Sequence, residues 1–322
     1  MKVKEIFETG LNLAVMVDPR GKKGVAEYLK RINKKYNNLS AKEKPYFDVD
    51  LLTNPYSDSK IHVDDQKTEV KRLIAGIDIG SGEILLASQL NERNKKIDLV
   101  IAHHPIGKGL SDLHEVMDMQ AAELQEAGVP IHVAEKLLDV RIGQISRRLH
   151  ANNHYQLVNL AELLGINIIN THTFTDNLVN DFLKKFLAKK QPETLEDLVE
   201  ALLEIPEYKK AKLQGSGPTI VAGLGRHHVG KYILEMTGGT EIGEKIYKEL
   251  SNYGISTVIS MHMSEDGHKM VNEHNMNVVI VGHIASDSLG MNLFLDELEK
   301  KGIEIVPCGG LIRVSRVKKN KK

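Results

Sequence analysis

Residues 99–106 read Leu-Val-Ile-Ala-His-His-Pro-Ile, an apolar run that ends in two adjacent histidines and a proline. The apolar run predicts a buried strand, and Pro105 predicts that this strand stops at the histidines. From about residue 71 onward, short apolar segments of this kind alternate with segments of helical periodicity. The alternation predicts an α/β fold with largely parallel, mixed sheets.

Eight segments have the composition of such strands, namely residues 72–79, 97–104, 129–135, 166–173, 218–225, 256–263, 277–284 and 303–310. Before them, residues 1–45 have helical periodicity, and residues 46–70 look irregular. We therefore expect four parts in chain order: an N-terminal helical and irregular extension (1–70), a first α/β lobe (71–190), a connecting region (191–235) and a second α/β lobe that completes the functional site (236–322).

The composition argues against several classes of function. Lys and Arg number 43 and Asp and Glu number 43, so no net charge attracts nucleic acid or an anionic membrane. Aromatic residues make up only 5% of the chain, which is too few for a single-strand stacking surface. No apolar run reaches the roughly 18 residues of a membrane span. Cys308 is the only cysteine, so we expect a cytoplasmic protein without a disulfide or a signal peptide.

Three of the predicted strands end in residue types that bind metals. The first ends in His103 and His104, while the other two end in a histidine with an aspartate four residues later: His172 with Asp176, and His283 with Asp287. Because ligands bind at the carboxyl ends of strands in α/β sheets, these side chains are expected to converge. Four imidazoles and two carboxylates suit a pair of divalent ions.

Each motif also has an ordinary interpretation. A single histidine after a strand is usually a surface-turn residue, and an aspartate at a helix start can simply cap the helix. Three similar motifs at equivalent positions favour the metal site over these alternatives. Adjacent histidines on a strand point to opposite sides, so His103 and His104 are expected to serve two separate ions.

Four segments, in this order, resemble the Nif-three-like family, whose members are also called GTP cyclohydrolase type two homologues: residues 98–105, 170–177, 238–250 and 279–290. The resemblance covers roughly residues 70–315. It implies two interlinked α/β lobes with a dinuclear metal site in the cleft between them, and a hexameric ring whose sites face an internal cavity. It also implies the ligands His103, His104, Asp176, His283 and Asp287, with His172 as a ligand or close neighbour.

This chain departs from the family pattern in three places, one of which is that its first 70 residues look longer than the usual start of the family. The last ligand is normally a glutamate, whereas Asp287 is one methylene shorter. The family often has a histidine in the wall of its second lobe, and residues 259–270 offer both His262 and His268 there. We expect His268 to be the proton donor, because an unligated histidine near the site can titrate in the working range.

The sequence thus predicts a metal-dependent hydrolase with two divalent transition-metal ions per chain, of zinc, iron or manganese. A nucleotide or related heterocycle is the substrate class implied by the resemblance. The alternative is a non-catalytic metal-binding scaffold or regulator that forms the same homohexamer.

Residues 225–231 nearly match a phosphate-binding loop, but Tyr232 stands where a serine or threonine would hold magnesium.

Overall fold

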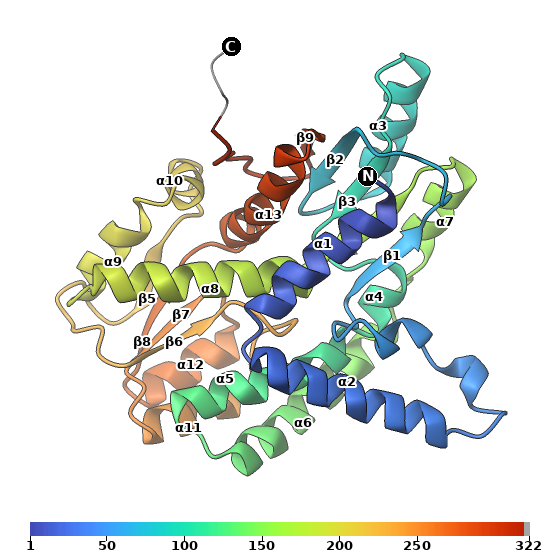
Figure 1. Ribbon diagram of the computed structural model, residues 1–322. Coiled ribbons are helices and arrows are strands. Elements are labelled where there is room, and N and C mark those ends of the chain that lie inside the picture. The colour runs from blue at the N-terminus through green and yellow to red at the C-terminus, as the bar shows by residue number, and fades with distance from the viewer. Residues whose placement is uncertain (319–322) are drawn as a thin grey trace.

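The computed structural model describes residues 1–318 and contains two sheets (Figure 1). The first sheet has the strand order β1-β4-β3-β2-β9. Its strands are β1 (Ser59–Val63), β2 (Arg72–Gly76), β3 (Leu99–Ala102), β4 (Ile168–Thr171) and β9 (Glu304–Cys308). All neighbouring strands run parallel except β1, which pairs antiparallel with β4 at one edge.

The second sheet has the strand order β5-β8-β7-β6. Its strands are β5 (Thr219–Ala222), β6 (Tyr232–Glu235), β7 (Thr257–Ser260) and β8 (Asn277–Ile280). Again only the edge strand β5 is antiparallel to its neighbour. The predicted α/β class, with two mixed and mostly parallel sheets, is confirmed.

The helices cover both faces of each sheet. They are α1 (Val3–Met16), α2 (Gly21–Asn38), α3 (Ser81–Glu92), α4 (Gly107–Ser111), α5 (Gln120–Ala127), α6 (Ile131–Leu149), α7 (Gln156–Leu163), α8 (His172–Lys190), α9 (Leu195–Leu202), α10 (Pro206–Leu213), α11 (Glu244–Asn252), α12 (Glu265–Glu273) and α13 (His283–Lys300). Three short 3₁₀ segments are also present. Two lie between α2 and β1, η1 (Lys44–Tyr46) and η2 (Val49–Leu52), and one lies between α4 and α5, η3 (Leu113–Met119). No helix among residues 1–318 is both long enough and apolar enough to cross a bilayer.

Helices α8 and α13 belong to both lobes. On α8, Phe174 packs in the core of the first sheet and Leu183 packs in the core of the second. On α13, Leu289 packs in the core of the second sheet and Phe294 packs in the core of the first. Helix α8 follows β4 of the first sheet, and α13 follows β8 of the second and leads back to β9 of the first. The two helices therefore interlink the lobes near the centre of the molecule (Figure 1).

The crossing of these two helices is unusually close. A Cβ atom added to Gly290 of α13 would lie 2.2 Å from the carbonyl oxygen of Thr175 in α8, which no real side chain tolerates. Glycine at this position lets the two helix backbones approach each other. As a result, Gly290, seven residues after the start of α13, lies against Thr175 in the first turn of α8.

Two predicted elements are wrong. Residues 129–135 are not a strand, because Pro130 precedes the first turn of α6, a place where the fixed φ angle of proline is compatible with a helix start. Residues 46–70 are not wholly irregular, because they contain β1. That strand, Ser-Lys-Ile-His-Val, contains only two apolar residues, Ile61 and Val63, which is too short a pattern to predict a strand, and it pairs with β4 at the sheet edge.

The predicted boundaries of the two lobes also do not coincide with the residues that form the two sheets. The connecting region 191–235 contains α9, α10, β5 and β6, which belong to the second lobe. The strand predicted at 303–310 exists as β9 but pairs parallel with β2 in the first sheet. The first lobe therefore takes one strand from the predicted extension and one from the end of the chain, because α13 carries the chain back across the molecule.

Candidate metal centre

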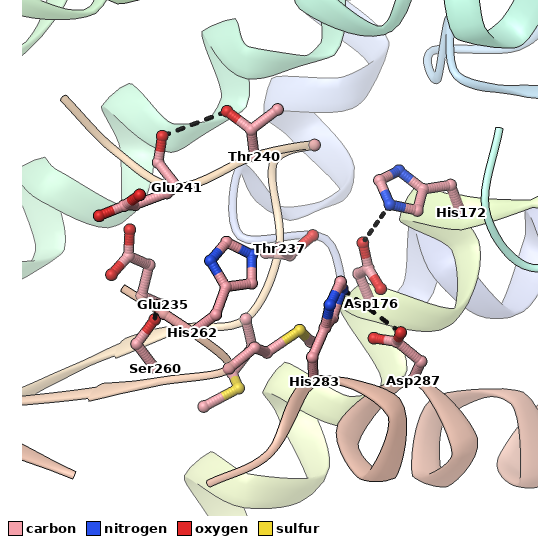
Figure 2. A pocket seen from close by; sticks show the side chains of 13 residues that line it. His172, Asp176, Glu235, Thr237, Thr240, Glu241, Ser260, His262, His283 and Asp287 are labelled. Atoms are coloured by element: carbon pink, nitrogen blue, oxygen red, sulfur yellow. Dashed lines mark hydrogen bonds and ion pairs between the residues drawn. The ribbon is translucent and has the colours of Figure 1, made fainter. Parts of the chain in front are cut away.

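The six predicted ligand residues lie together where the two lobes meet. His103 and His104 follow β3 directly, His172 and Asp176 occupy the first turns of α8, and His283 and Asp287 occupy the first turns of α13. Figure 2 shows the four helical residues pointing into one cavity from the two helices. The close crossing at Gly290 is what brings the two aspartates into the same site.

Asp287 is the centre of this cluster. Its Oδ1 lies 3.5 Å from Nε2 of His103, and its Oδ2 lies 3.4 Å from Nε2 of His104 and 3.5 Å from Nε2 of His283. Asp176 also faces His103, with 3.5 Å between Oδ1 and Nε2. Ligand atoms placed tetrahedrally about 2.0–2.1 Å from a zinc ion would be about 3.4 Å apart, so this spacing fits a bound metal.

The opposite ring nitrogens of three histidines are held by hydrogen bonds. Nδ1 of His104 donates to Asp78 (2.6 Å), and Nδ1 of His172 donates to Asp58 (2.8 Å). Nδ1 of His103 is 2.9 Å from the hydroxyl of Thr175, whose own proton is directed to the carbonyl oxygen of Thr171. Such bonds fix the ring orientation and leave Nε2 unprotonated, as in histidines that bind metals.

Asp58, Asp78 and Thr175 were not among the residues predicted from the sequence. Asp78 follows β2 within the predicted strand segment 72–79, so the rule that polar residues at strand ends converge could have found it. Asp58 precedes β1 in the segment expected to be irregular, and nothing in the sequence signals its role. Its Oδ2 accepts hydrogen bonds from both His172 and Thr173, and the residue is fully buried.

The cluster contains more buried acceptors than the protein can satisfy. Within residues 1–318, His103 Nε2, Asp176 Oδ1 and both carboxylate oxygens of Asp287 are buried without a hydrogen-bond partner. Lone pairs and carboxylate charge that converge in a dry site are costly unless a cation compensates them. The donor set of imidazole and carboxylate is the one that divalent transition metals bind, so the residues fit a metal centre.

Burial and the surrounding charges shift the pKa values of Asp176 and Asp287 in opposite directions. Burial, followed by the nearby charges of Asp287 and Asp58, raises the pKa of Asp176 well above its ordinary value. Burial opposes ionisation of Asp287 as well, but the surrounding histidines outweigh it and lower its pKa. Burial lowers the pKa of His103 to about 4, so its ring is neutral and its Nε2 can act as a ligand near neutral pH.

Asp287 is not a helix cap. The residue before the first turn of α13 is Gly282, and neither oxygen of Asp287 accepts a backbone hydrogen bond within residues 1–318. The capping alternative therefore does not explain why a carboxylate with 1% exposure lies there.

The ligand atoms fall into overlapping groups that suggest a dinuclear centre. One group is His103, Asp176 and Asp287, and another is His104, His283 and Asp287, so that the two share one carboxylate. His172 forms a further group with His103 and His104. The expectation that the adjacent histidines point to opposite sides is wrong: their ring centres are 5.1 Å apart and both face Asp287. Strand geometry ends at Ala102, so strand alternation does not reach them.

His268, the expected proton donor, does not line the cavity of the metal centre. It lies on α12, where its Nε2 contacts the carbonyl oxygen of Val221 at 3.1 Å. His262 lines the cavity instead, with its ring centre 4.9 Å from that of His283 (Figure 2). Both residues lie in the segment predicted to form this wall, but only His262, in the loop after β7, faces the site.

The cavity of the metal centre is small, with a volume of about 40 Å³. The cluster forms one side, and the second lobe supplies the other, where Glu235, Glu241 and Ser260 lie around His262 (Figure 2). Burial and the nearby charge of Glu241 raise the pKa of Glu235 to about 8. Glu235 accepts hydrogen bonds from Ile242 N and Tyr247 Oη, so it stabilises this wall.

The segment that resembles a phosphate-binding loop does not contribute to the centre. Residues 225–231 form a loop before β6 and line no part of the cavity. Lys231, the lysine of the partial motif, donates a hydrogen bond to the carbonyl oxygen of Ala127, and His227 contacts Asn277.

The chain is similar to several solved structures. A NIF3 superfamily protein from Sphaerobacter thermophilus shares 29% sequence identity, with a TM-score of 0.72 over 79% of this chain and 92% of that chain. The protein TTHA1606 from Thermus thermophilus shares 15% identity over 91% and 99% of the two chains, with a TM-score of 0.45. A Bacillus cereus protein related to NIF3 shares 12% identity over 82% and 92%, with a TM-score of 0.43.

No protein-family model and no curated protein matches the chain. The likeness to the Sphaerobacter structure covers 79% of this chain, and the chain also carries a buried His/Asp cluster. In fold and in sequence, this chain is therefore similar to a member of the NIF3 superfamily.

Proposed function

We propose that this protein is a metal-dependent hydrolase with two divalent ions held by His103, His104, Asp176, His283 and Asp287, and with His172 beside them. One observation carries the proposal: both carboxylate oxygens of the buried Asp287 face histidine Nε2 atoms and have no hydrogen-bond partner within residues 1–318. A bound cation would compensate the charge and the unpaired lone pairs of this buried carboxylate.

A pair of divalent ions supplies Lewis acidity, which lowers the pKa of water and activates it as a nucleophile near neutral pH. The protein supplies orientation and protons. Asp58, Asp78 and Thr175 fix the histidine rings, and His262 provides an imidazole at the mouth of the cavity. Its ring makes no hydrogen bond within residues 1–318 and is exposed, so we assign it the proton transfer first expected of His268.

The substrate class follows from the family resemblance: a nucleotide or a related heterocycle, in a reaction like that of a GTP cyclohydrolase. The ions are proposed to be zinc, iron or manganese, which bind the mixed imidazole and carboxylate set. We further propose a homohexamer, as the same resemblance implies. A cytoplasmic location agrees with the single cysteine, Cys308.

The test combines metal analysis with a substrate screen. Protein purified without added metal is expected to contain close to two transition-metal ions per chain by elemental analysis. The metal-loaded protein is then screened against nucleotides and phosphoesters beside the Asp287→Asn variant. Turnover by the parent and not by the variant supports a hydrolase. Two tightly bound ions without turnover would favour the non-catalytic scaffold.

A further inference from the structure

A second cavity adjoins that of the metal centre. It has a volume of about 490 Å³, and Thr240, Glu241 and His262 line both cavities. The cavity at the metal centre holds no more than a few water molecules, since its volume is about 40 Å³. Only the reacting group of a substrate fits there, so the rest of the substrate must lie outside. The neighbouring cavity is in the size range of small-molecule sites.

One wall of this second cavity is the basic face of α6. Arg141 and Arg148 are seven residues apart, which places them on the same side of the helix, with Ile145 between them. We call the cavity the arginine pocket and define it by Arg141, Arg148, Asn152, Thr240, Glu241 and His262.

Neither arginine is neutralised by the protein. Within residues 1–318, neither guanidinium forms an ion pair, and Arg148 donates no hydrogen bond. Arg141 donates only from Nε, to the backbone carbonyl oxygen of Glu241 at 3.3 Å, so that its two terminal nitrogens have no acceptor. That contact places Arg141 beside Glu241, which lines both cavities.

Among the residues of 1–318 that line the arginine pocket, Glu241 is the acidic one, and it forms no ion pair with Arg141 or Arg148. Oε1 of Glu241 accepts hydrogen bonds from the backbone and hydroxyl of Ser264, and it contacts the hydroxyl of Tyr247 at 3.4 Å. The wall therefore presents two guanidinium groups with unused donors toward a concave space. A planar guanidinium is suited to bind phosphate oxygens through paired hydrogen bonds.

We propose that the arginine pocket binds the phosphate group of a phosphorylated small-molecule substrate while its reacting atom enters the metal centre. This inference rests on the proposed function and specifies its substrate class. Arg148 is the main phosphate contact, and Arg141 adds a second while it holds the segment that contains Glu241.

The test uses inorganic phosphate as the probe and protein freed of metal with a chelator, so that no metal ion can bind the phosphate. Titration calorimetry compares the parent with the variants Arg148→Gln and Arg141→Gln. Arg147→Gln is the matched control, because Arg147 is exposed on the same helix and lines neither cavity. Thermal unfolding checks that each variant folds.

We expect phosphate to bind the parent at one site per chain. Arg148→Gln should weaken binding at least tenfold, about 1.4 kcal/mol. Arg141→Gln should weaken it similarly, and Arg147→Gln should stay within twofold. Absence of binding to the parent, or equal binding to a folded Arg148→Gln variant, would overturn the proposal. Metal uptake is measured separately, so that a parent that binds phosphate but takes up no metal contradicts the hydrolase proposal alone.

Discussion

Nε2 of His103 and Oδ1 of Asp287 are 3.5 Å apart, although the first follows a strand of one sheet and the second lies on a helix that follows a strand of the other. Both atoms are buried, and neither has a hydrogen-bond partner within residues 1–318. The two lobes therefore meet at a point where both side chains offer hydrogen-bond acceptors and no hydrogen-bond donor from the described part of the protein faces them. Most of the following predictions test what this point binds and what holds it in place.

Asp287→Asn should bind at least one ion tenfold or more weakly, about 1.4 kcal/mol, because the amide keeps the shape of the side chain but removes its charge. Titration calorimetry of chelator-treated protein with Zn²⁺ measures this. Asp287→Glu should retain metal, since it restores the residue type usual in the family. Glu297→Gln, on the solvent side of α13, is the control. Unchanged binding of both ions by Asp287→Asn would remove Asp287 from the ligand set.

Asp58→Asn should weaken metal binding about 10- to 100-fold, because the carboxylate fixes the ring of His172 through Nδ1. Asp139→Asn, an exposed aspartate on α6, should have no effect. The unfolding temperature of the metal-free variant separates loss of orientation from loss of folding. A well-folded Asp58→Asn variant with parental affinity for Zn²⁺ would show that the hydrogen bond to His172 does not support the centre.

Gly290→Ala should destabilise the protein by about 1–3 kcal/mol or more, because the new Cβ would lie 2.2 Å from the carbonyl oxygen of Thr175. Since this contact sets the distance between α8 and α13, metal affinity should fall as well. Denaturant unfolding and a Zn²⁺ titration measure the two effects. Gly82→Ala in α3 meets open space and should instead stabilise by up to about 1 kcal/mol. Equal stabilities of the two variants would contradict the close crossing.

Glu123 should make the stability depend on pH. Burial raises its pKa to about 8, while Asn180 donates a hydrogen bond to its Oε1. The folded state keeps the proton up to about pH 8, whereas the unfolded chain releases it near its ordinary pKa of about 4.3. The folded state therefore binds more protons in this interval, so the free energy of unfolding falls as pH rises through it and levels off above pH 8.

Denaturant unfolding between pH 5 and 9 measures this dependence. Glu123→Gln should remove the part of the slope due to Glu123, on the order of a few kcal/mol in total. Glu235 has a similarly raised pKa, so a smaller slope should remain. An unchanged slope in Glu123→Gln would mean that Glu123 is ionised in the folded protein.

The proposed ring is tested by light scattering at micromolar concentration. A hexamer should give six times the 35.9 kDa mass of one chain. A mass equal to one chain would remove the hexamer and the enclosed cavity that the family resemblance implies.

The sequence by itself determined the α/β class and the metal-binding residue types. Both depend on local pattern: a short apolar run predicts a buried strand, and a histidine or aspartate just after it lies at the strand end whatever the rest of the chain does. For that reason His103, His172 and His283 could each be placed at the carboxyl end of a strand without any knowledge of the sheet order, although β8, which precedes His283, belongs to the second sheet. The edge strand β1 and the start of α6 were missed, because their local composition does not distinguish them from the structures predicted there.

Only the tertiary structure decided how these residues combine. The meeting of Asp176 with Asp287 depends on the close approach of Thr175 and Gly290, two residues whose contact no local pattern encodes. The same holds for Asp58, which directly precedes β1 and contacts His172, and for His262, which faces the cavity while His268 contacts Val221. These features arise where helices cross and the chain returns between lobes, so they depend on packing between residues far apart in sequence.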